Sequence, residues 1–450
     1  MCLLALFAAG AAAAEPVPGW LHGPGAAAER VAEPVFGGDL VLYRAGPRGA
    51  PAVVLVHGLG QNGARDWEAV VPALATDREV WALDLPGFGA SARGNQLYSP
   101  ENYARAIEAV LAPRLKQPFV LVGHSMGAAV SLAYADAYPA RLSRLVLVDM
   151  AGVLQRSVYA GFLGRLGAEQ VTGAYPADGA WVDRVIGGLL LRAESLPIDP
   201  ELLLRAPPIR QKLLRGDPNA IAAAALVQQD FGAALRRLRT PTLLIWGVDD
   251  KVAPLRTGLV AQALVPQARL ALIEQSGHAP QLQQPARFNA LLRDELAGRT
   301  PGRAREAPAA AFAAQRVGAC EDQDGQRFSG DYRAITLTRC RDVEIRDARV
   351  GRLVSIASEA RLVNVELREG LTAADSALEL TAGSVQGAPA ITLDTSTLDA
   401  AGTRIMSPAE PVLNRGAEPV TLQLSVCEVL RAGSPSYVHQ VVRIAPRQRW

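Results

Sequence analysis

The sequence has few cysteines, almost no net charge and no apolar segment long enough to cross a bilayer, and each absence excludes a class of protein. The formal net charge of +2 gives no reason to expect nucleic acid or an anionic membrane as a partner. The four cysteines form no C-x-x-C motif and the histidines form no cluster, so we expect neither a metal site nor another cofactor. Hydrophobic residues still make up 49% of the 450 residues, which is enough for two packed domains.

Residues 1–14 predict a signal peptide. A short apolar run leads to Ala12 and Ala14, which supply an A-x-A cleavage pattern before Glu15. This pattern predicts export, and therefore a periplasmic or secreted protein. No Lys or Arg precedes the apolar run, so a disordered Ala-rich tail is the alternative.

Three cysteines follow this segment, all in the last third of the chain. An exported protein can pair two of them and leave one thiol over. On proximity alone we expect the pair to be Cys320 and Cys340, with Cys427 left over. Three buried thiols without a disulfide are the alternative.

The first domain is expected at 15–298. From 31 to about 298 short apolar runs alternate with segments of helical character, which is typical of a parallel sheet covered on both faces. The predicted helices include 67–74 and 100–111, and runs near Val35 and at 40–42 are candidates for an antiparallel hairpin at the sheet edge. The predicted strands are 53–56, 80–83, 119–122, 145–148, 243–246 and 270–273.

The alternation stops between about 150 and 239, where Leu, Ala and Arg dominate. We interpret this stretch as a helical cap that shapes a substrate pocket; packing helices without substrate contact are the alternative. A linker rich in Pro, Gly and charge follows at 299–316.

From 317 to 450 short alternating runs recur every ten to twenty residues, and helical windows are nearly absent. This spacing predicts stacked coils and resembles a right-handed parallel β-helix, with a β-sandwich as the rival. Such a domain offers a surface for an envelope component or a polymer. Its coils show no stacked Trp or Tyr pattern that would suggest polysaccharide binding.

The pentapeptide 123–127, Gly-His-Ser-Met-Gly, lies between a predicted strand and a predicted helix. G-x-S-x-G in this context is a nucleophile elbow, which exposes the hydroxyl of Ser125 on a sharp turn. A serine nucleophile needs a base, and the base needs a group that fixes its tautomer.

His278 is the expected base, because it follows the last predicted strand at the carboxyl edge of the sheet, where catalytic groups gather. Asp249 and Asp250 follow the preceding strand, and Asp149 ends an earlier one. Any of these carboxylates is a candidate acid, and spacing alone does not separate Asp249 from Asp250.

The reaction also needs donors for a developing oxyanion. We assign one to the backbone N–H of Met126, at the start of the helix, and the other to that of Leu59, in the Gly-rich turn 57–60. A simple turn without this role is the alternative for 57–60.

Together these residues resemble the α/β-hydrolase superfamily, in particular serine esterases and lipases with a helical cap. The resemblance covers about 31–298. It implies an α/β fold, a Ser-His-Asp triad and the choice of Asp250 as acid, three residues after Gly247. Five motifs in order carry it: 56–60, 84–91, 123–127, 246–250 and 276–280.

We therefore expect a serine hydrolase that cleaves carboxylic esters through an acyl-enzyme. The Leu- and Ala-rich cap favours a small, apolar ester. A carbon–carbon bond hydrolase and a cofactor-free haloperoxidase-like enzyme use the same triad and stay open. A third hypothesis is a binding protein that acts through the C-terminal β domain.

Overall fold

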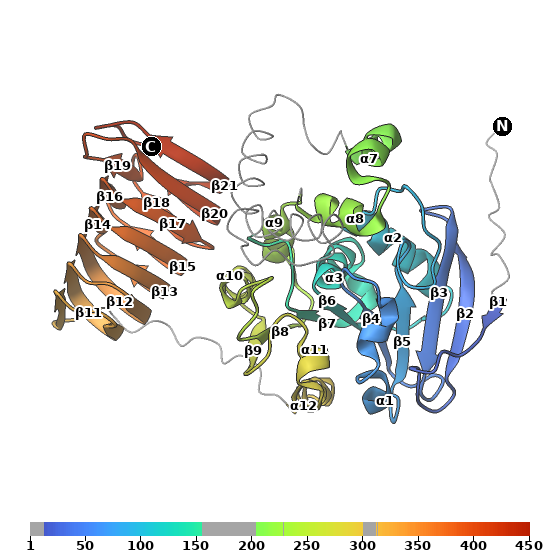
Figure 1. Cartoon of the computed structure of the whole chain (residues 1–450). Helices are drawn as coiled ribbons and strands as arrows, with labels where there is room; N and C mark the ends of the chain where they lie inside the picture. The colour runs from blue at the N-terminus through green and yellow to red at the C-terminus, as the bar shows by residue number, and fades with distance from the viewer. Residues whose placement is uncertain (1–12, 155–203, 228, 300–311, 313) are drawn as a thin grey trace. The chain divides into compact units, whose positions relative to one another are not determined.

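The computed structural model describes residues 13–154, 204–227, 229–299, 312 and 314–450. Most of the predicted signal peptide, most of the predicted linker and the first part of the predicted cap lie outside these residues. The chain divides into two compact units, one formed mainly by residues up to 303 and the other mainly by residues from 304 (Figure 1). Among the described residues, no helix has the length and apolarity needed to traverse a membrane.

The first unit is built on one nine-stranded sheet in the order β1-β2-β3-β5-β4-β6-β7-β8-β9 (Figure 1). The strands from β5 to β9 in this order are parallel, while β1, β2 and β3 add an antiparallel edge. The predicted hairpin is present at this edge, but Val35 lies in its turn and the first strand is 27–33. The strands are β1 (Ala13–Glu15), β2 (Ala27–Glu33), β3 (Gly38–Ala45), β4 (Ala52–Val56), β5 (Glu79–Asp84), β6 (Phe119–His124), β7 (Leu142–Val148), β8 (Thr242–Gly247) and β9 (Arg269–Ile273).

Helices cover the sheet because its central strands are apolar on both faces. Trp67, Leu74, Phe288 and Leu292 pack against the valines of β4 and β6 on one face. On the other face α3 packs against β6 and β7 and against α2. The described helices are η1 (Gly63–Trp67), α1 (Val71–Leu74), α2 (Pro100–Leu111), α3 (Met126–Ala137), η2 (Pro139–Arg141), α7 (Pro207–Leu214), α8 (Pro218–Val227), α9 (Phe231–Arg237), α10 (Leu255–Leu264), α11 (Pro280–Gln283) and α12 (Pro285–Leu296).

The helix α2 begins and ends where the sequence predicts it. The side chain of Ser99 caps it by accepting the N–H of Asn102, and Pro100 occupies the first turn, where its missing N–H costs nothing. The predicted helix 67–74 is wrong: the segment divides into η1 and the four-residue α1. Pro72 supplies no N–H for a continuous helix across the segment.

The second unit consists of strands that pair in parallel, apart from the last, β21, which is antiparallel to β20. This excludes the β-sandwich and gives a β-helix-like domain. The strands are β10 (Val317–Glu321), β11 (Arg327–Thr338), β12 (Val343–Ile356), β13 (Glu359–Leu367), β14 (Leu371–Ala374), β15 (Ala377–Gln386), β16 (Ile391–Asp394), β17 (Thr397–Ala401), β18 (Arg404–Ser407), β19 (Val412–Asn414), β20 (Val420–Arg431) and β21 (Ser434–Ile444).

Its core is a stack of equivalent apolar side chains from successive coils. Val343 pairs with Ala360, Ala360 with Leu378, Leu378 with Leu398, and Leu398 with Leu422. All five are buried in one cluster. The distance along the chain between partners lengthens through this series, which explains why no single repeat period can be read from the sequence.

A second stack is polar. The N–H of Ser358 donates to Oγ of Ser376, and the N–H of Ser376 donates to Oγ of Ser396, at 3.1 and 3.0 Å. The N–H of Cys340 donates in the same way to Oγ of Ser358. Each hydroxyl therefore satisfies the backbone at a corner that the strand ladders leave unpaired.

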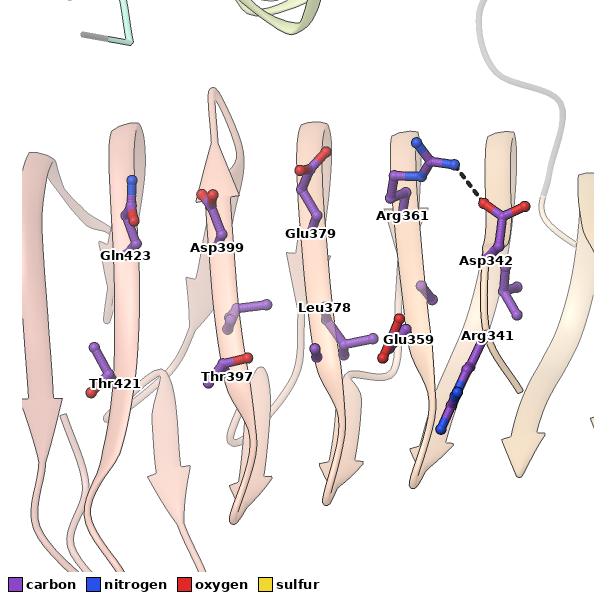
Figure 2. Close-up of a pocket in the computed structure, with 14 residues that line it drawn as sticks. Arg341, Asp342, Glu359, Arg361, Leu378, Glu379, Thr397, Asp399, Thr421 and Gln423 are labelled. Carbon is purple, nitrogen blue, oxygen red and sulfur yellow. Dashed lines mark hydrogen bonds and ion pairs between the residues drawn. The ribbon is translucent and has the colours of Figure 1, made fainter. Parts of the chain in front are cut away.

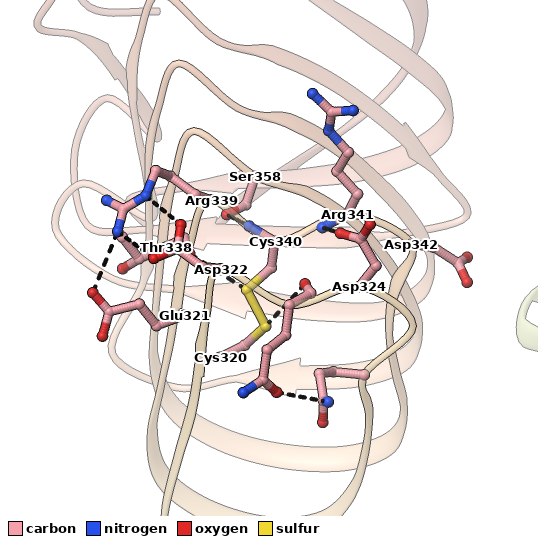
Figure 3. Close-up of a disulfide and its surroundings, with 12 residues drawn as sticks. Cys320, Glu321, Asp322, Asp324, Thr338, Arg339, Cys340, Arg341, Asp342 and Ser358 are labelled. Atoms are coloured by element: carbon pink, nitrogen blue, oxygen red, sulfur yellow. Dashed lines mark hydrogen bonds and ion pairs between the residues drawn. A yellow bond between two sulfur atoms is a disulfide. The ribbon is translucent and has the colours of Figure 1, made fainter.

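Cys320 and Cys340 form a disulfide, as predicted (Figure 3). The bridge links the first coil to the start of this polar stack, and Arg339 next to it forms an ion pair with Asp322. Cys427 is a buried thiol that donates to the carbonyl oxygen of Ala400.

The outward face of the second unit carries a groove of about 690 Å³ that crosses several coils (Figure 2). It is lined by charged groups of both signs, hydroxyls and an amide, among them Arg341, Glu359, Thr397, Thr421 and Gln423.

Candidate active site

Ser125 lies at the turn between β6 and α3, with φ 53° and ψ −117°. This conformation is strained for a residue with a side chain, at a cost of about 1–3 kcal/mol. The surrounding chain holds it there: the N–H of Ser125 donates to Val148 O at 2.9 Å, and its carbonyl oxygen accepts the N–H of Ala128.

Each of the two glycines of the pentapeptide stands where a larger residue would collide with a different part of the chain. A Cβ on Gly123 would overlap the carbonyl oxygen of Gly127 and the hydroxyl of Ser131. A Cβ on Gly127 would overlap the carbonyl oxygens of Val56 and His57, at the end of β4. The close approach of α3 to the sheet therefore requires both glycines.

His278 connects Ser125 to a carboxylate. Its Nε2 lies 2.8 Å from Oγ of Ser125, and its Nδ1 lies 2.8 Å from Oδ2 of Asp250. The Asp250 side chain has no exposed surface, whereas the imidazole is 23% exposed. A carboxylate on Nδ1–H leaves Nε2 without a proton, so Nε2 can accept the proton of the serine hydroxyl.

The structure brings Asp250, and not Asp249, to His278. Oδ1 of Asp250 accepts the backbone N–H groups of Val252 and Ala253, which turns its other oxygen toward the imidazole. Asp249 is exposed, and its backbone N–H ties this loop to the carbonyl oxygen of Ser276 at 2.8 Å. The acid and base loops are thus held together by the backbone.

The backbone N–H groups of Leu59 and Met126 have no hydrogen-bond partner among the described residues. The turn that contains Leu59 lies against the elbow, because a Cβ on Gly58 would come within 3.0 Å of Cβ of Ser125. The next N–H, of Gly60, is taken by Oδ1 of Asn219 in α8 at 3.0 Å. Both N–H groups are therefore free to donate, one from the turn that lies against the elbow and one from the residue that follows Ser125.

His57 supports this turn, a role that the sequence analysis missed. Its Nδ1–H donates to Gly58 O at 2.7 Å, and its Nε2 accepts the N–H of Leu85 at 3.0 Å. The side chain is fully buried. The position of this histidine in a Gly-rich turn after a strand is the sequence signal that indicates such a hydrogen-bonding role.

His124 is the second residue that was missed. Its Nε2–H donates to the carbonyl oxygen of His278 at 2.5 Å and so connects the elbow to the base loop. Burial, together with the neighbouring His278, lowers the pKa of His124 to about 3. The imidazole is therefore neutral at physiological pH, in agreement with its Nδ1, which is buried and has no hydrogen-bond partner among the described residues.

Asp149, the remaining acid candidate, follows β7, and the carboxylate that binds His278 is that of Asp250. It is fully buried, and its Oδ1 accepts the N–H of Gly247 at 2.9 Å. Burial raises the pKa of Asp149 well above its usual range, and the negative charge of Asp250 raises it further.

A strand–elbow–helix unit with a hydroxyl, an imidazole and a buried carboxylate in one hydrogen-bonded row defines a class of serine hydrolases. The family model of the alpha/beta hydrolase fold matches residues 51–285. The chain belongs to this family, and hydrolase activity is supported by it.

Two relatives and one solved structure illustrate the similarity. An uncharacterized protein of Mycobacterium tuberculosis is 31% identical over 53% of this chain and 73% of its own length. A 2-hydroxy-6-oxo-2,4-heptadienoate hydrolase of Pseudomonas putida is 31% identical over 54% of this chain and 88% of its own length. A thermophilic esterase from Thermogutta terrifontis is 26% identical, covers 60% of this chain and 97% of its own, and has a TM-score of 0.45.

Proposed function

We propose that the protein is a serine hydrolase of carboxylic esters, with Ser125 as nucleophile, His278 as general base and acid, and Asp250 as the carboxylate that orients His278. The observation that carries this proposal is the row of two 2.8 Å contacts from Asp250 through His278 to Ser125. The unpaired N–H groups of Leu59 and Met126 supply an oxyanion hole.

The steps follow from the geometry. Oγ of Ser125 attacks the acyl carbon while Nε2 of His278 takes the hydroxyl proton, and the two N–H groups bind the oxygen that becomes negative. The carbon–oxygen bond to the alcohol then breaks, and His278 returns the proton to the alcohol. Water repeats the sequence on the acyl-enzyme and releases the acid and Ser125.

A carbon–carbon bond hydrolase is the second candidate, favoured by the name of the Pseudomonas putida relative. Both reactions proceed by addition to a carbonyl group, but they differ in the bond that then breaks, which is carbon–oxygen in one and carbon–carbon in the other. Parallel turnover of short and long p-nitrophenyl esters and of a 2-hydroxy-6-oxo-dienoic acid separates the two. Faster turnover of the dienoic acid than of every ester would favour carbon–carbon cleavage.

A fluorophosphonate probe tests the nucleophile without knowledge of the substrate. We expect mass spectrometry to find the label on Ser125 of the full chain, and Ser125→Ala to lose both label and turnover. Ser143→Ala, a change at an exposed serine of β7, is the matched control and should keep both. A label elsewhere, or turnover that survives Ser125→Ala, would remove Ser125 from this role.

We also propose that the groove of the second unit binds a polymer chain rich in hydroxyl groups, through polar contacts and not through the aromatic stacking that its coils lack. Its hydroxyl, amide and charged side chains can hydrogen-bond to such a chain, and its mixed charges disfavour a polyanion. The full chain should sediment with insoluble cellulose or chitin, and a double change of Thr397 and Thr421 to Arg should abolish this. Thr372→Arg, outside the groove, is the control. A wild-type protein that stays in solution with both polymers would overturn the proposal.

A further inference from the structure

Two buried carboxyl groups lie side by side beneath the candidate active site, although a triad needs only one. Asp149 has no exposed surface and follows β7, and Asp250 follows the neighbouring strand β8. Both residues bind to Gly247 at the end of β8: Oδ1 of Asp149 accepts the N–H of Gly247, and the carbonyl oxygen of Gly247 accepts the N–H of Asp250. Two ionised carboxylates in such a place repel each other strongly, so the pair requires an explanation.

The hydrogen bonds of Asp250 identify it as the ionised member. Its Oδ1 accepts two backbone N–H groups, of Val252 and Ala253, at 2.7 and 3.0 Å. Its Oδ2 accepts Nδ1–H of His278 at 2.8 Å. Three donors converge on this side chain, which stabilises a negative charge.

Asp149 has the opposite surroundings. Its Oδ1 accepts one N–H, from Gly247 at 2.9 Å. Its Oδ2 is buried and has no donor among the described residues. A carboxylate oxygen without a donor is costly in the interior, whereas a protonated oxygen needs only an acceptor nearby.

We propose that Asp149 carries a proton and donates its O–H to the carboxylate of Asp250, which makes it a positioning residue for the triad acid. This inference rests on the proposed function, because it assigns Asp149 a role through Asp250 and His278. The hydrogen bond occupies a lone pair of Asp250 and fixes the plane of its carboxylate, so that Oδ2 stays on Nδ1 of His278 while the imidazolium forms.

The charges around Asp149 support a shared proton. Burial and the charge of Asp250 raise the pKa of Asp149, and the single N–H of Gly247 opposes this only in part. The other titratable groups that face the pair, His278 and His124, come from the loop after β9 and from β6. Deprotonation of Asp149 at alkaline pH adds a second negative charge beside Asp250 and should displace it from the imidazole.

Asp149→Asn tests the proposal, because an amide keeps an N–H donor for Asp250 and a carbonyl for Gly247. Asparagine also tolerates the φ of 41° at this position. We expect kcat at neutral pH to stay within about threefold of wild type, since the hydrogen bond is kept. The fall of kcat at alkaline pH that deprotonation of Asp149 causes should disappear. Asp149→Ala, which cannot donate, should lower kcat about tenfold to hundredfold with little change in KM.

Infrared difference spectroscopy gives a readout that needs no turnover. At neutral pH wild type and Ser125→Ala should both show the carbonyl stretch of a buried protonated carboxyl group, and Asp149→Asn should lack it. Asp136→Asn, at an exposed aspartate of α3 that pairs with Arg237, is the matched control and should change neither the band nor the pH profile.

The pH dependence of the free energy of unfolding also tests whether Asp149 is protonated in the folded protein. The folded protein keeps a proton on Asp149 that the unfolded chain releases above about pH 4, so this group stabilises the fold at low pH and loses its contribution as pH rises toward its folded pKa. Asp149→Asn should remove this dependence of the free energy of unfolding on pH.

A missing infrared band, or loss of activity in Asp149→Asn as severe as in Asp149→Ala, would overturn the proposal even where Ser125 labelling succeeds. Failed labelling with an intact band would overturn the proposed function alone.

Discussion

In the first unit, three non-glycine residues with positive φ lie at the end of the sheet that carries the elbow, whereas in the second unit such residues recur from coil to coil. Ser125, Asp149 and Gln275 have φ values of 53°, 41° and 57°, and each follows the end of a different strand. The second unit has a series that opens successive corners: Asp322, Arg339, Ala357, Asp375 and Thr395.

The hydrogen bonds explain the difference. In the second unit the N–H of Ala357 donates to Ala374 O, and the N–H of Asp375 donates to Asp394 O, so each corner joins its coil to the next. In the first unit the three residues have different partners: the N–H groups of Ser125 and Asp149 donate to Val148 O and Ile245 O, and Gln275 O accepts from the Gln284 side chain. Positive φ that recurs from coil to coil is part of how the fold is built. Positive φ at a single residue beside other polar groups indicates a functional site.

The largest expected effect of a single substitution is the loss of turnover when the triad acid, Asp250, is changed. Asp250→Asn should lower kcat by about three to four orders of magnitude, because an amide on Nδ1 stabilises the wrong tautomer of His278. The free energy of unfolding should change little. Turnover depends on this single carboxylate, whereas the stability of the fold depends on many contacts. Steady-state turnover of the best p-nitrophenyl ester measures this.

Asp249→Asn is the matched control, because Asp249 is the adjacent aspartate and is exposed. It should keep turnover close to wild type. A larger loss in Asp249→Asn than in Asp250→Asn would reverse the assignment and would mean that the loop rearranges during catalysis.

A smaller effect is expected in the polar stack of the second unit. Oγ of Ser376 accepts the N–H of Ser358 and the hydroxyl of Ser355, at 3.1 and 3.0 Å. Ser376→Ala leaves both donors unpaired in the interior and should destabilise the coils by about 2 kcal/mol. Hydrogen exchange of the amides around this corner measures the loss, and turnover should not change.

Ser436→Ala, at an exposed serine of β21, should leave the same amides protected. Equal protection in Ser376→Ala and wild type would show that the stack contributes nothing to stability. A loss of turnover in Ser376→Ala would contradict the expectation that this stack affects the stability of the second unit and not the activity of the first.

The sequence predicted what depends on local pattern. Apolar runs located the sheet strands, and the motifs located Ser125, His278 and the pair 249–250, which the fold brings to one edge of the sheet. Roles that depend on tertiary contact were missed, as for His124 and Asp149, because neither carries a local signature of its partner. Ser358, Ser376 and Ser396 were missed for another reason: their spacing is visible in the sequence but varies from coil to coil.

The smallest effect is expected at a corner where a residue with a side chain has positive φ. Ala357 is exposed and has φ 47°, a conformation that costs an L-residue about 1–2 kcal/mol and glycine almost nothing. Ala357→Gly relieves this strain but frees the unfolded chain, so the net result should be a gain of about 0.5 kcal/mol or less. Ala377→Gly, at an exposed alanine of β15 with ordinary φ, should instead lose about 0.5–1 kcal/mol. Hydrogen exchange of both variants in the full chain measures the difference in sign. Equal losses would mean that the corners are held by their hydrogen bonds alone, and that positive φ in the second unit imposes no strain that a substitution can release.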